Sequence, residues 1–279
     1  MGIPAKRQWS WLPSFAVCCV VATVVLIPLL ATLLGGLRTN GELLTEPFSI
    51  PKTLHWENFG LVLASDSPFW GEIVNSLVTV TGTVVLLLFA ACPAAFVLAR
   101  ISFRGREVVF NFFLFGLLFP LTVAVLPLYI TIRQFGLLDS LWGVILPQAA
   151  FGLPITILIL RNFFRAIPIE LEDAATIDGA SKPIFFWRVL LPLARPAIAV
   201  VSILAVVSSW NNFLLPLLVL TDQSQWTLPI GATQFQQQYA TDWPSILAFV
   251  TLAMIPAILI YLLAERQIVA GLTAGAVKG

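Results

Sequence analysis

Long apolar runs separated by short polar segments dominate the pattern of this chain. A run of about 20 apolar residues can cross the hydrocarbon core of a bilayer, because a helix satisfies its own backbone N–H and C=O groups where water is absent. Six runs are long enough, at residues 14–37, 73–99, 108–132, 140–160, 197–220 and 244–264. The pattern predicts an all-α polytopic membrane protein, with six transmembrane helices in one transmembrane domain over residues 1–279.

The composition agrees with a membrane protein, since 59% of the residues are hydrophobic and 10% are charged. Soluble domains carry about 25% charged residues. The first run follows Lys6 and Arg7, as in a secretory signal peptide, but signal peptides have an apolar region of only about 7–15 residues. We therefore expect the run at 14–37 to be a span, with a cleaved signal peptide as the alternative.

The basic residues between the runs predict the orientation, because such residues stay on the cytoplasmic side of a membrane. With the N-terminus inside and six crossings, only three of the 15 lysines and arginines fall outside: Arg38, Lys52 and Arg133. We expect a multi-pass protein of the cell (inner) membrane, in contact with lipid, with both termini in the cytoplasm.

The six runs contain no Asp, Glu, Lys, Arg or His. Proton relays and ion-coupled carriers keep such residues within the membrane, so the sequence argues against both, and against a membrane enzyme. The chain also lacks the G-x-x-x-x-G-K-[ST] loop that holds ATP phosphates, and its net charge of +1 gives no reason to expect a nucleic-acid partner. We expect no catalytic residue, metal site or cofactor in this chain, which leaves a passive channel or a transporter driven by a partner.

The longest loop predicted on the cytoplasmic side, residues 161–196, separates the fourth and fifth runs. Pro168 suits the first turn of a helix, because its missing N–H would have no partner there. Three acidic residues then complement the positive end of the helix dipole: Glu170, Glu172 and Asp173. Gly179 can end this helix in the left-handed conformation.

A second helix is expected after the turn, with Ser181 as its cap and with Pro192 and Pro196 breaking it before the fifth run. The small residues of the first helix would let another protein approach closely. The loop therefore suits a protein-docking element, and an amphipathic connector on the membrane surface is the alternative.

Residues 172–180, with the sequence EDAATIDGA, and the later pair Leu191-Pro192 resemble the E-A-A…G…L-P signature of ABC importer permeases. In that family the loop forms coupling helices that dock in a groove of a cytoplasmic ATPase. Asp173 stands where the signature has glutamate, which keeps the charge. The resemblance implies a set of ATPase-coupling residues: Glu172, Asp173, Ala174, Ala175, Asp178, Gly179 and Ala180.

The resemblance covers nearly the whole chain and is closest to the carbohydrate branch of the family, the relatives of the second permease subunit of the maltose transporter. Further stretches carry it: Asn75-Ser76, residues 94–100 and 146–154, Trp210-Asn211-Asn212-Phe213 and the end at 269–279. It implies the type I ABC importer fold and uptake of a di- or oligosaccharide by ATP-driven alternating access. Glycerol phosphate or a peptide is the alternative cargo.

The same resemblance implies an assembly. Its members would be a second permease subunit, in a heterodimer or a homodimer, two ATPases that bind ATP and Mg, and an extracytoplasmic sugar-binding protein. Residues 265–279 form a cytoplasmic C-terminal tail, for which the resemblance implies a further contact with the ATPases. The outer segment at 234–239 is a candidate contact for the binding protein, or a plain loop.

The most polar cluster inside any run lies in the fifth, around Trp210: Ser208, Ser209, Asn211 and Asn212. Unpaired amides are costly in hydrocarbon, so these side chains should face other helices or a wet cavity. Asn, Ser and Trp can hydrogen-bond to sugars and stack on them. Ser208, Asn211 and Asn212 are therefore candidates for the substrate path, with hydrogen bonding between helices as the alternative.

Overall fold

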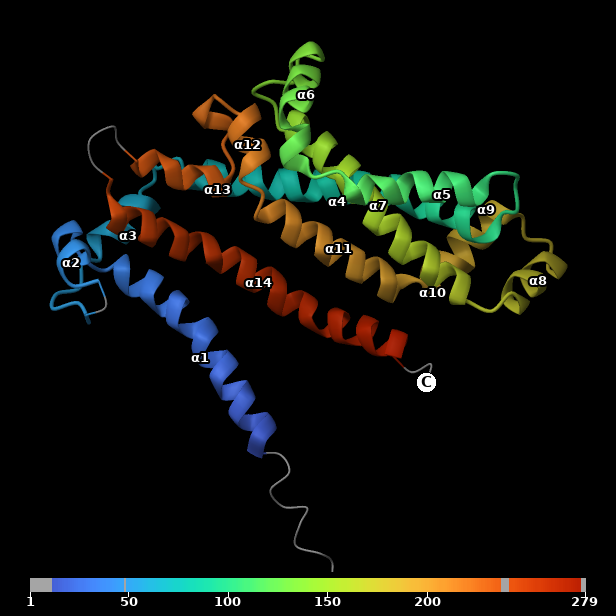
Figure 1. Ribbon diagram of the computed structural model, residues 1–279, viewed down its shortest axis with the longest axis horizontal. Helices are drawn as coiled ribbons and strands as arrows, with labels where there is room; N and C mark the ends of the chain where they lie inside the picture. Colours follow the sequence, from blue (N-terminus) through green and yellow to red (C-terminus); the bar gives the residue numbers. More distant parts are fainter. Residues whose placement is uncertain (1–11, 48, 237–240, 277–279) are drawn as a thin grey trace, which may run out of the picture. The chain divides into compact units, whose positions relative to one another are not determined.

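The computed structural model describes residues 12–47, 49–236 and 241–276, and these residues are mostly helical (Figure 1). They contain no β-strand, so the all-α prediction is confirmed. The chain divides into two compact units, the first made of Met1–Phe69 and Ala232–Ile255 and the second of Trp70–Gly231 and Pro256–Gly279. Lys6, Arg7, residues 237–239 of the candidate outer contact and the last three residues of the tail lie outside the described residues.

The first unit holds α1 (Leu12–Gly35), α2 (Asn40–Thr45), α3 (Glu57–Leu63), the 3₁₀ turn η5 (Ala232–Phe235) and the first part of α14 (Trp243–Ala276). The end of α1 lies close against α14, since a Cβ on Gly36 would be 2.9 Å from the backbone of Ala248. Only glycine permits this approach. Asn58 of α3 fixes the turn that follows, because its Nδ2 donates to the carbonyl oxygens of Gly36 and Arg38, each at 3.0 Å.

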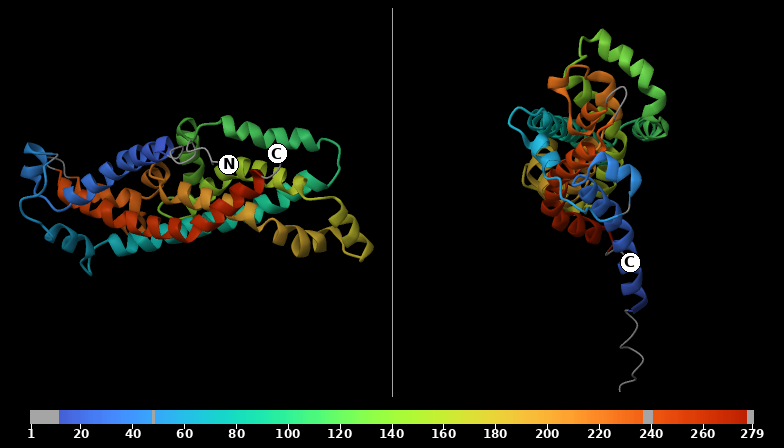
Figure 2. Two further views of the ribbon diagram at one scale, coloured as in Figure 1. Left: turned by 90° about the horizontal axis from the view of Figure 1, so that it is seen from below. Right: turned by 90° about the vertical axis from the view of Figure 1, so that its left-hand side faces the viewer.

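The second unit is built around α4 (Phe69–Arg100), α7 (Trp142–Ala166) and α11 (Arg195–Trp210) (Figure 2). Their facing sides form one core of buried apolar residues that includes Ala91 of α4, Ile157 of α7 and Val201 of α11. Helix α5 (Arg106–Phe115) packs beside α7. The packing of α4, α7 and α11 fixes the positions of the polar side chains that line the cavity described below.

Four described helices are long and apolar enough to span a membrane: α1, α4, α7 and the part of α14 up to Leu262. Two bent pairs meet the same test together, Arg106–Leu118 with Leu121–Gln134, bent by 100°, and Lys182–Leu193 with Arg195–Trp210, bent by 75°. If each bent pair is one span, the described residues hold six. Helix α14 continues past the predicted boundary at 264, so residues 265–276 of the predicted tail extend it.

The third run, at 108–132, is not the single helix that we predicted. Helix α5 passes into the 3₁₀ turn η2 (Gly116–Leu118), and α6 (Leu121–Gln134) starts in a new direction. Pro120 has no N–H to continue the helix and disfavours helical backbone in the residue before it. Phe119 is accordingly extended, with φ −93° and ψ 104°.

The fifth run, at 197–220, also ends earlier than predicted. Helix α11 stops at Trp210, and the short helix α12 (Leu214–Val219) follows after a break. Asn212 lies in this break, and its Oδ1 accepts a hydrogen bond from the backbone N–H of Leu215 at 3.2 Å. That bond satisfies an amide of the first turn of α12, which has no partner within the helix. Asn211 and Asn212 thus mark a helix break, which the length of the apolar run does not reveal.

The loop at 161–196 contains the predicted helix, turn and helix. After α7 ends at Ala166, α8 (Glu170–Ile177) is followed by α9 (Lys182–Phe185), the π-helical turn η3 (Phe186–Leu190) and α10 (Leu191–Leu193). Three expectations were wrong. Helix α8 begins at Glu170, so Pro168 precedes the helix and does not lie in its first turn. Ser181 holds the cap position of α9 but its side chain makes no cap hydrogen bond, and Pro192 lies inside the helical segment, which bends at Ala194 instead. The π-helical turn η3 directly precedes Pro192, whose missing N–H and ring disfavour a regular α-helix through this segment.

Candidate functional site

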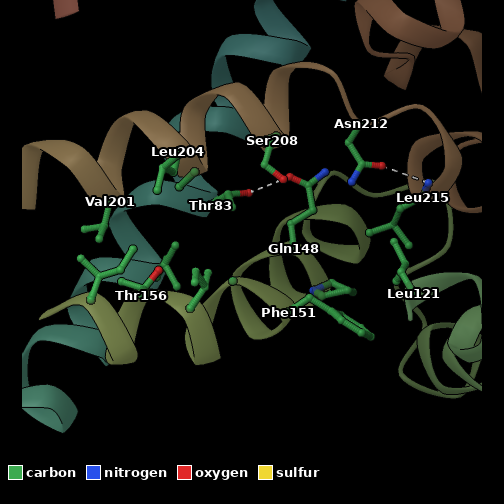
Figure 3. A pocket seen from close by; sticks show the side chains of 17 residues that line it. Thr83, Leu121, Gln148, Phe151, Thr156, Val201, Leu204, Ser208, Asn212 and Leu215 are labelled. Carbon is green, nitrogen blue, oxygen red and sulfur yellow. Dashed lines mark hydrogen bonds between the residues drawn. The ribbon is translucent and has the colours of Figure 1, made fainter. Parts of the chain in front are cut away.

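A cavity of about 210 Å³ lies in the second unit and is lined mainly by α4, α7 and α11 (Figure 3). Hydroxyl and amide side chains contribute its polar groups: Thr83, Gln148, Thr156, Ser208, Ser209 and Asn212. Apolar side chains, Phe151 and Leu204 among them, form the rest of the wall. None of the described residues that line the cavity is charged. Mostly apolar walls with a few convergent polar groups are typical of a small-molecule site.

Two helices hold the central amide of this cavity. Gln148 of α7 accepts a hydrogen bond at its Oε1 from the hydroxyl of Thr83 on α4, at 3.4 Å, and Ser208 of α11 points toward the same group (Figure 3). The Nε2 of Gln148 and the Oγ of Ser209 are buried and have no hydrogen-bond partner within the described part of the chain. Leaving such a group unpaired costs about 1–3 kcal/mol, so both favour a hydrogen-bonding solute.

The structure brings two of the three predicted path residues to the cavity, Ser208 and Asn212. Asn211 does not line it. This side chain is exposed, and its Nδ2 donates to the carbonyl oxygen of Val207 at 2.8 Å, at the end of its own helix. Ser209, which belongs to the same polar cluster, does line the cavity.

Sequence reasoning missed the cavity residues on the other helices, Thr83, Gln148 and Thr156. One signal was present, because Gln148 is an amide inside an otherwise apolar run. Thr83 and Thr156 carry no comparable signal, since threonine is common in membrane helices, where its hydroxyl can bond within the helix.

The loop after α7 presents the second candidate site, and the turn at its centre is well defined. The backbone N–H of Gly179 bonds to the carbonyl of Thr176 at 3.0 Å, and that of Ala180 bonds to the carbonyl of Ala175 at 2.8 Å. These two bonds form a Schellman motif, which requires a left-handed residue at the position of Gly179. Its φ of +80° meets this requirement, as the sequence predicted.

One side of α8 faces away from the rest of the second unit. Asp173, Ala174 and Asp178 are exposed on it, together with Ile177, which is 85% exposed. In Figure 1 the helix lies at the end of the second unit opposite to α12. Charged, small and apolar side chains thus share a surface that another protein can contact.

Glu172 is the one buried residue of the predicted coupling set, at 3% exposed, while Ala175 and Ala180 are half-buried. Its Oε1 accepts a hydrogen bond from the Nζ of Lys182, and its Oε2 lies 3.6 Å from the Nη1 of Arg100. Arg100 is the last residue of α4, and its Nη2 also donates to the carbonyl oxygens of Phe164, at 2.7 Å, and Ile167. The carboxylate is therefore buried between two cations.

Another carboxylate is buried at the opposite end of α4. Glu72 precedes the predicted run at 73–99 but lies in the first turn of the helix, and it is 1% exposed. Neither of its carboxylate oxygens has a hydrogen-bond partner among the described residues. Gly231 makes room for it, since a Cβ there would overlap the carboxylate. The helix thus includes a buried acid that the boundary of the apolar run had left out.

Residues 88–273 match a family described as binding-protein-dependent transport system inner membrane component. Two similar relatives are permeases. The chain is 34% identical over 264 residues to the diacetylchitobiose uptake system permease protein NgcG of Streptomyces coelicolor, an alignment that covers 94% of this chain and 87% of that protein. It is 33% identical over 263 residues to the arabinooligosaccharides transport system permease protein AraQ of Bacillus subtilis, with 93% of each covered.

A solved structure has a similar fold. It is the crystal structure of a bacterial ABC transporter involved in the import of the acidic polysaccharide alginate, and one of its chains matches with a TM-score of 0.79 and 22% identity. The match covers 95% of this chain and 99% of that one. The fold of this chain is therefore one already seen in an ABC importer.

Proposed function

The chain belongs to the family of binding-protein-dependent transport system inner membrane components, and from this premise we propose that it admits an uncharged di- or oligosaccharide to the cell. As a permease it is a transport subunit and not an enzyme. The type I ABC importer fold expected from the sequence agrees with the similarity to the alginate importer.

The cavity between α4, α7 and α11 is the observation that carries the proposal. Its polar groups are hydroxyls and amides, which exchange hydrogen bonds with sugar hydroxyls, and Phe151 offers a ring for the apolar face of a sugar. The relatives named for diacetylchitobiose and arabinooligosaccharides support a carbohydrate cargo.

An anionic cargo has less support. A phosphate such as glycerol phosphate would favour arginine or lysine near its path, because burying an unpaired anion is costly. The described residues that line the cavity include neither. The absence of charge is the reason for proposing an uncharged sugar here.

The energy for transport comes from ATP hydrolysis in other subunits. Two ATPases bind ATP and Mg, and their closure moves the loop that contains α8 and with it the spans, so that the pathway opens alternately to the two sides. The exposed Asp173, Ala174 and Asp178 provide the docking surface for an ATPase, and Gly179 shapes the turn behind it. This chain binds no cofactor of its own.

The assembly completes the pathway. A single chain supplies half of it, a second permease subunit supplies the other half, and an extracytoplasmic binding protein delivers the sugar. The chain lies in the cell (inner) membrane with both termini in the cytoplasm, an orientation supported by the basic residues of its loops.

Purification of the tagged chain from its native membranes tests the proposal. We expect an ATPase, a second permease and a binding protein to accompany it. The melting temperature of that binding protein should rise with one or more neutral oligosaccharides and stay constant with glycerol phosphate. A binding protein stabilised only by a phosphorylated or carboxylated solute would contradict the cargo, and recovery of the chain without an ATPase would contradict the importer.

A further inference from the structure

Glu172 lies in a helix that has little other attachment to the second unit. It is the one buried residue among the eight of α8, and Ala175 is the helix's half-buried contact with the apolar core. The two ends of α8 are a chain segment after Ile167 and the glycine turn at Gly179. A movement applied to α8 thus reaches the spans through the backbone, one alanine and the carboxylate of Glu172.

Each partner of this carboxylate belongs to a different element. Arg100 ends α4, and its hydrogen bonds to the carbonyls of Phe164 and Ile167 also hold the end of α7. Lys182 begins α9, whose Phe185 contacts Phe96 of α4 with 6.5 Å between ring centroids. The carboxylate therefore joins α8 to α4 directly and to the end of α7 through one guanidinium.

The burial of these charges makes the link stiff. The side chains of Arg100 and Glu172 are 6% and 4% exposed, so water screens their attraction little. Separating α8 from α4 would leave an uncompensated charge in a buried place, which is energetically costly. The ion pair therefore opposes this separation. Surface ion pairs have no such effect, because solvent replaces the lost partner.

We propose that Glu172 is a positioning residue that transmits the movement of α8 to α4 through Arg100, and that it makes no contact with the ATPase itself. The inference rests on the proposed importer function. Two faces of α8 then take part in coupling. The exposed face contacts another subunit, and the buried face holds the helix to the spans.

Glu172→Gln is the test variant, because glutamine keeps the shape of the side chain and removes its charge. Glu170→Gln is the matched control, since Glu170 is an exposed carboxylate on the same helix. Each variant is purified with its partner subunits, reconstituted into proteoliposomes, and assayed for sugar uptake and ATP hydrolysis in the same preparation. The quantity compared is sugar transported per ATP hydrolysed.

For Glu172→Gln we expect this ratio to fall about tenfold, within the usual range of coupling free energies. The ATPase should still co-purify in the wild-type amount, and Glu170→Gln should keep the wild-type ratio. A normal ratio in Glu172→Gln would overturn the proposal. So would loss of the ATPase from Glu172→Gln alone, because that result would place the carboxylate in the docking contact.

A second variant covers the case in which Glu172→Gln does not insert. Arg100→Gln with Glu172→Gln removes both charges of the buried pair, which avoids the uncompensated cation that the single change leaves. The link is still absent, so the ratio should again be low, and a normal ratio would overturn the proposal. Failure of the wild-type chain to retain any ATPase would instead contradict the proposed function, which keeps the two outcomes apart.

Discussion

The guanidinium of Arg161 on α7 donates from its Nε to the main-chain oxygen of Leu98 on α4, at 3.0 Å. The same group lies 3.7 Å from the centroid of the Phe110 ring, and its Nη2 bonds to Glu107 of α5 at 2.5 Å. Arg100 makes the reverse connection, from α4 to the carbonyl oxygen of Phe164 on α7. Each of the two long helices thus holds the other through an arginine.

Arg161→Met should destabilise the protein by about 2 kcal/mol, because it removes a charge-assisted hydrogen bond and leaves a carbonyl in a buried place without its donor. The measurement is the melting temperature of the purified chain in detergent. Arg165→Met is the control, since Arg165 is an exposed arginine one turn further along α7, and it should melt at the wild-type temperature. Equal shifts in both variants would show that the contacts of Arg161 with Leu98, Phe110 and Glu107 add no specific stability.

Gln148→Leu should lower the apparent affinity for the sugar about tenfold, because it removes an amide donor and acceptor from the cavity in exchange for a similar volume. Uptake in proteoliposomes over a range of sugar concentrations gives this value. Asn211→Leu is the matched control, an amide changed to leucine outside the cavity, and should leave uptake unchanged. A larger loss in Asn211→Leu than in Gln148→Leu would move the path away from this cavity.

Local signals explain which parts of this fold the sequence predicts well. The end of α8 depends on Gly179, whose left-handed conformation is a property of one residue and its neighbours. The break before α6 depends on its surroundings. Three prolines lie inside intact helices: Pro93, Pro147 and Pro154. Pro120 instead lies at the break between the 3₁₀ turn η2 and α6. A proline in an apolar run therefore does not by itself reveal a break.

Contacts between distant segments explain what the sequence could not show. A glutamate in a short loop helix predicts a solvated side chain, and only the fold brings Glu172 to Arg100 at the end of α4. The cavity is similar, since Thr83 and Gln148 become one site when α4 packs against α7. Ser208 and Asn212 were predicted because they lie close together in the sequence.

Gly179→Trp should abolish the stimulation of ATP hydrolysis by sugar and binding protein. The backbone strain is modest, at about 1–2 kcal/mol for a side chain in the left-handed region, and nothing lies within 4 Å of a Cβ at this position. The protein should therefore insert normally while the indole blocks the docking surface. ATP hydrolysis by the reconstituted complex is the assay.

Gly105→Trp provides the control for that experiment. Gly105 also has a positive φ, of +88°, and also has nothing within 4 Å of a Cβ, but it precedes α5 and lies outside the loop that contains α8. Gly105→Trp should cause similar backbone strain, and sugar and binding protein should still stimulate ATP hydrolysis. Stimulation that survives in Gly179→Trp, or disappears equally in both variants, would remove the special role of the α8 turn.

Asp139→Asn should alter the pH dependence of stability. Asp139 lies in the turn between α6 and α7 with φ +56°, and its carboxylate accepts hydrogen bonds from the backbone N–H of Asp222, at 2.7 Å, and from the hydroxyl and N–H of Thr221. These bonds, that from Asp222 first, hold the pKa of the carboxyl below its usual value. Asparagine tolerates the left-handed backbone and isolates the effect of the charge.

The sign follows from the lowered pKa. The stabilisation by Asp139 is complete above the pKa of the unfolded chain, about 3.9, and is lost as the pH falls through the lower pKa of the folded protein. Asp139→Asn should therefore melt below the wild type at pH 7, and the two melting temperatures should converge as the pH is lowered toward 3. Asp66→Asn, at an exposed aspartate between α3 and α4, should show no such convergence. A difference between Asp139→Asn and the wild type that stays constant over this range would mean that the carboxylate contributes through its shape alone.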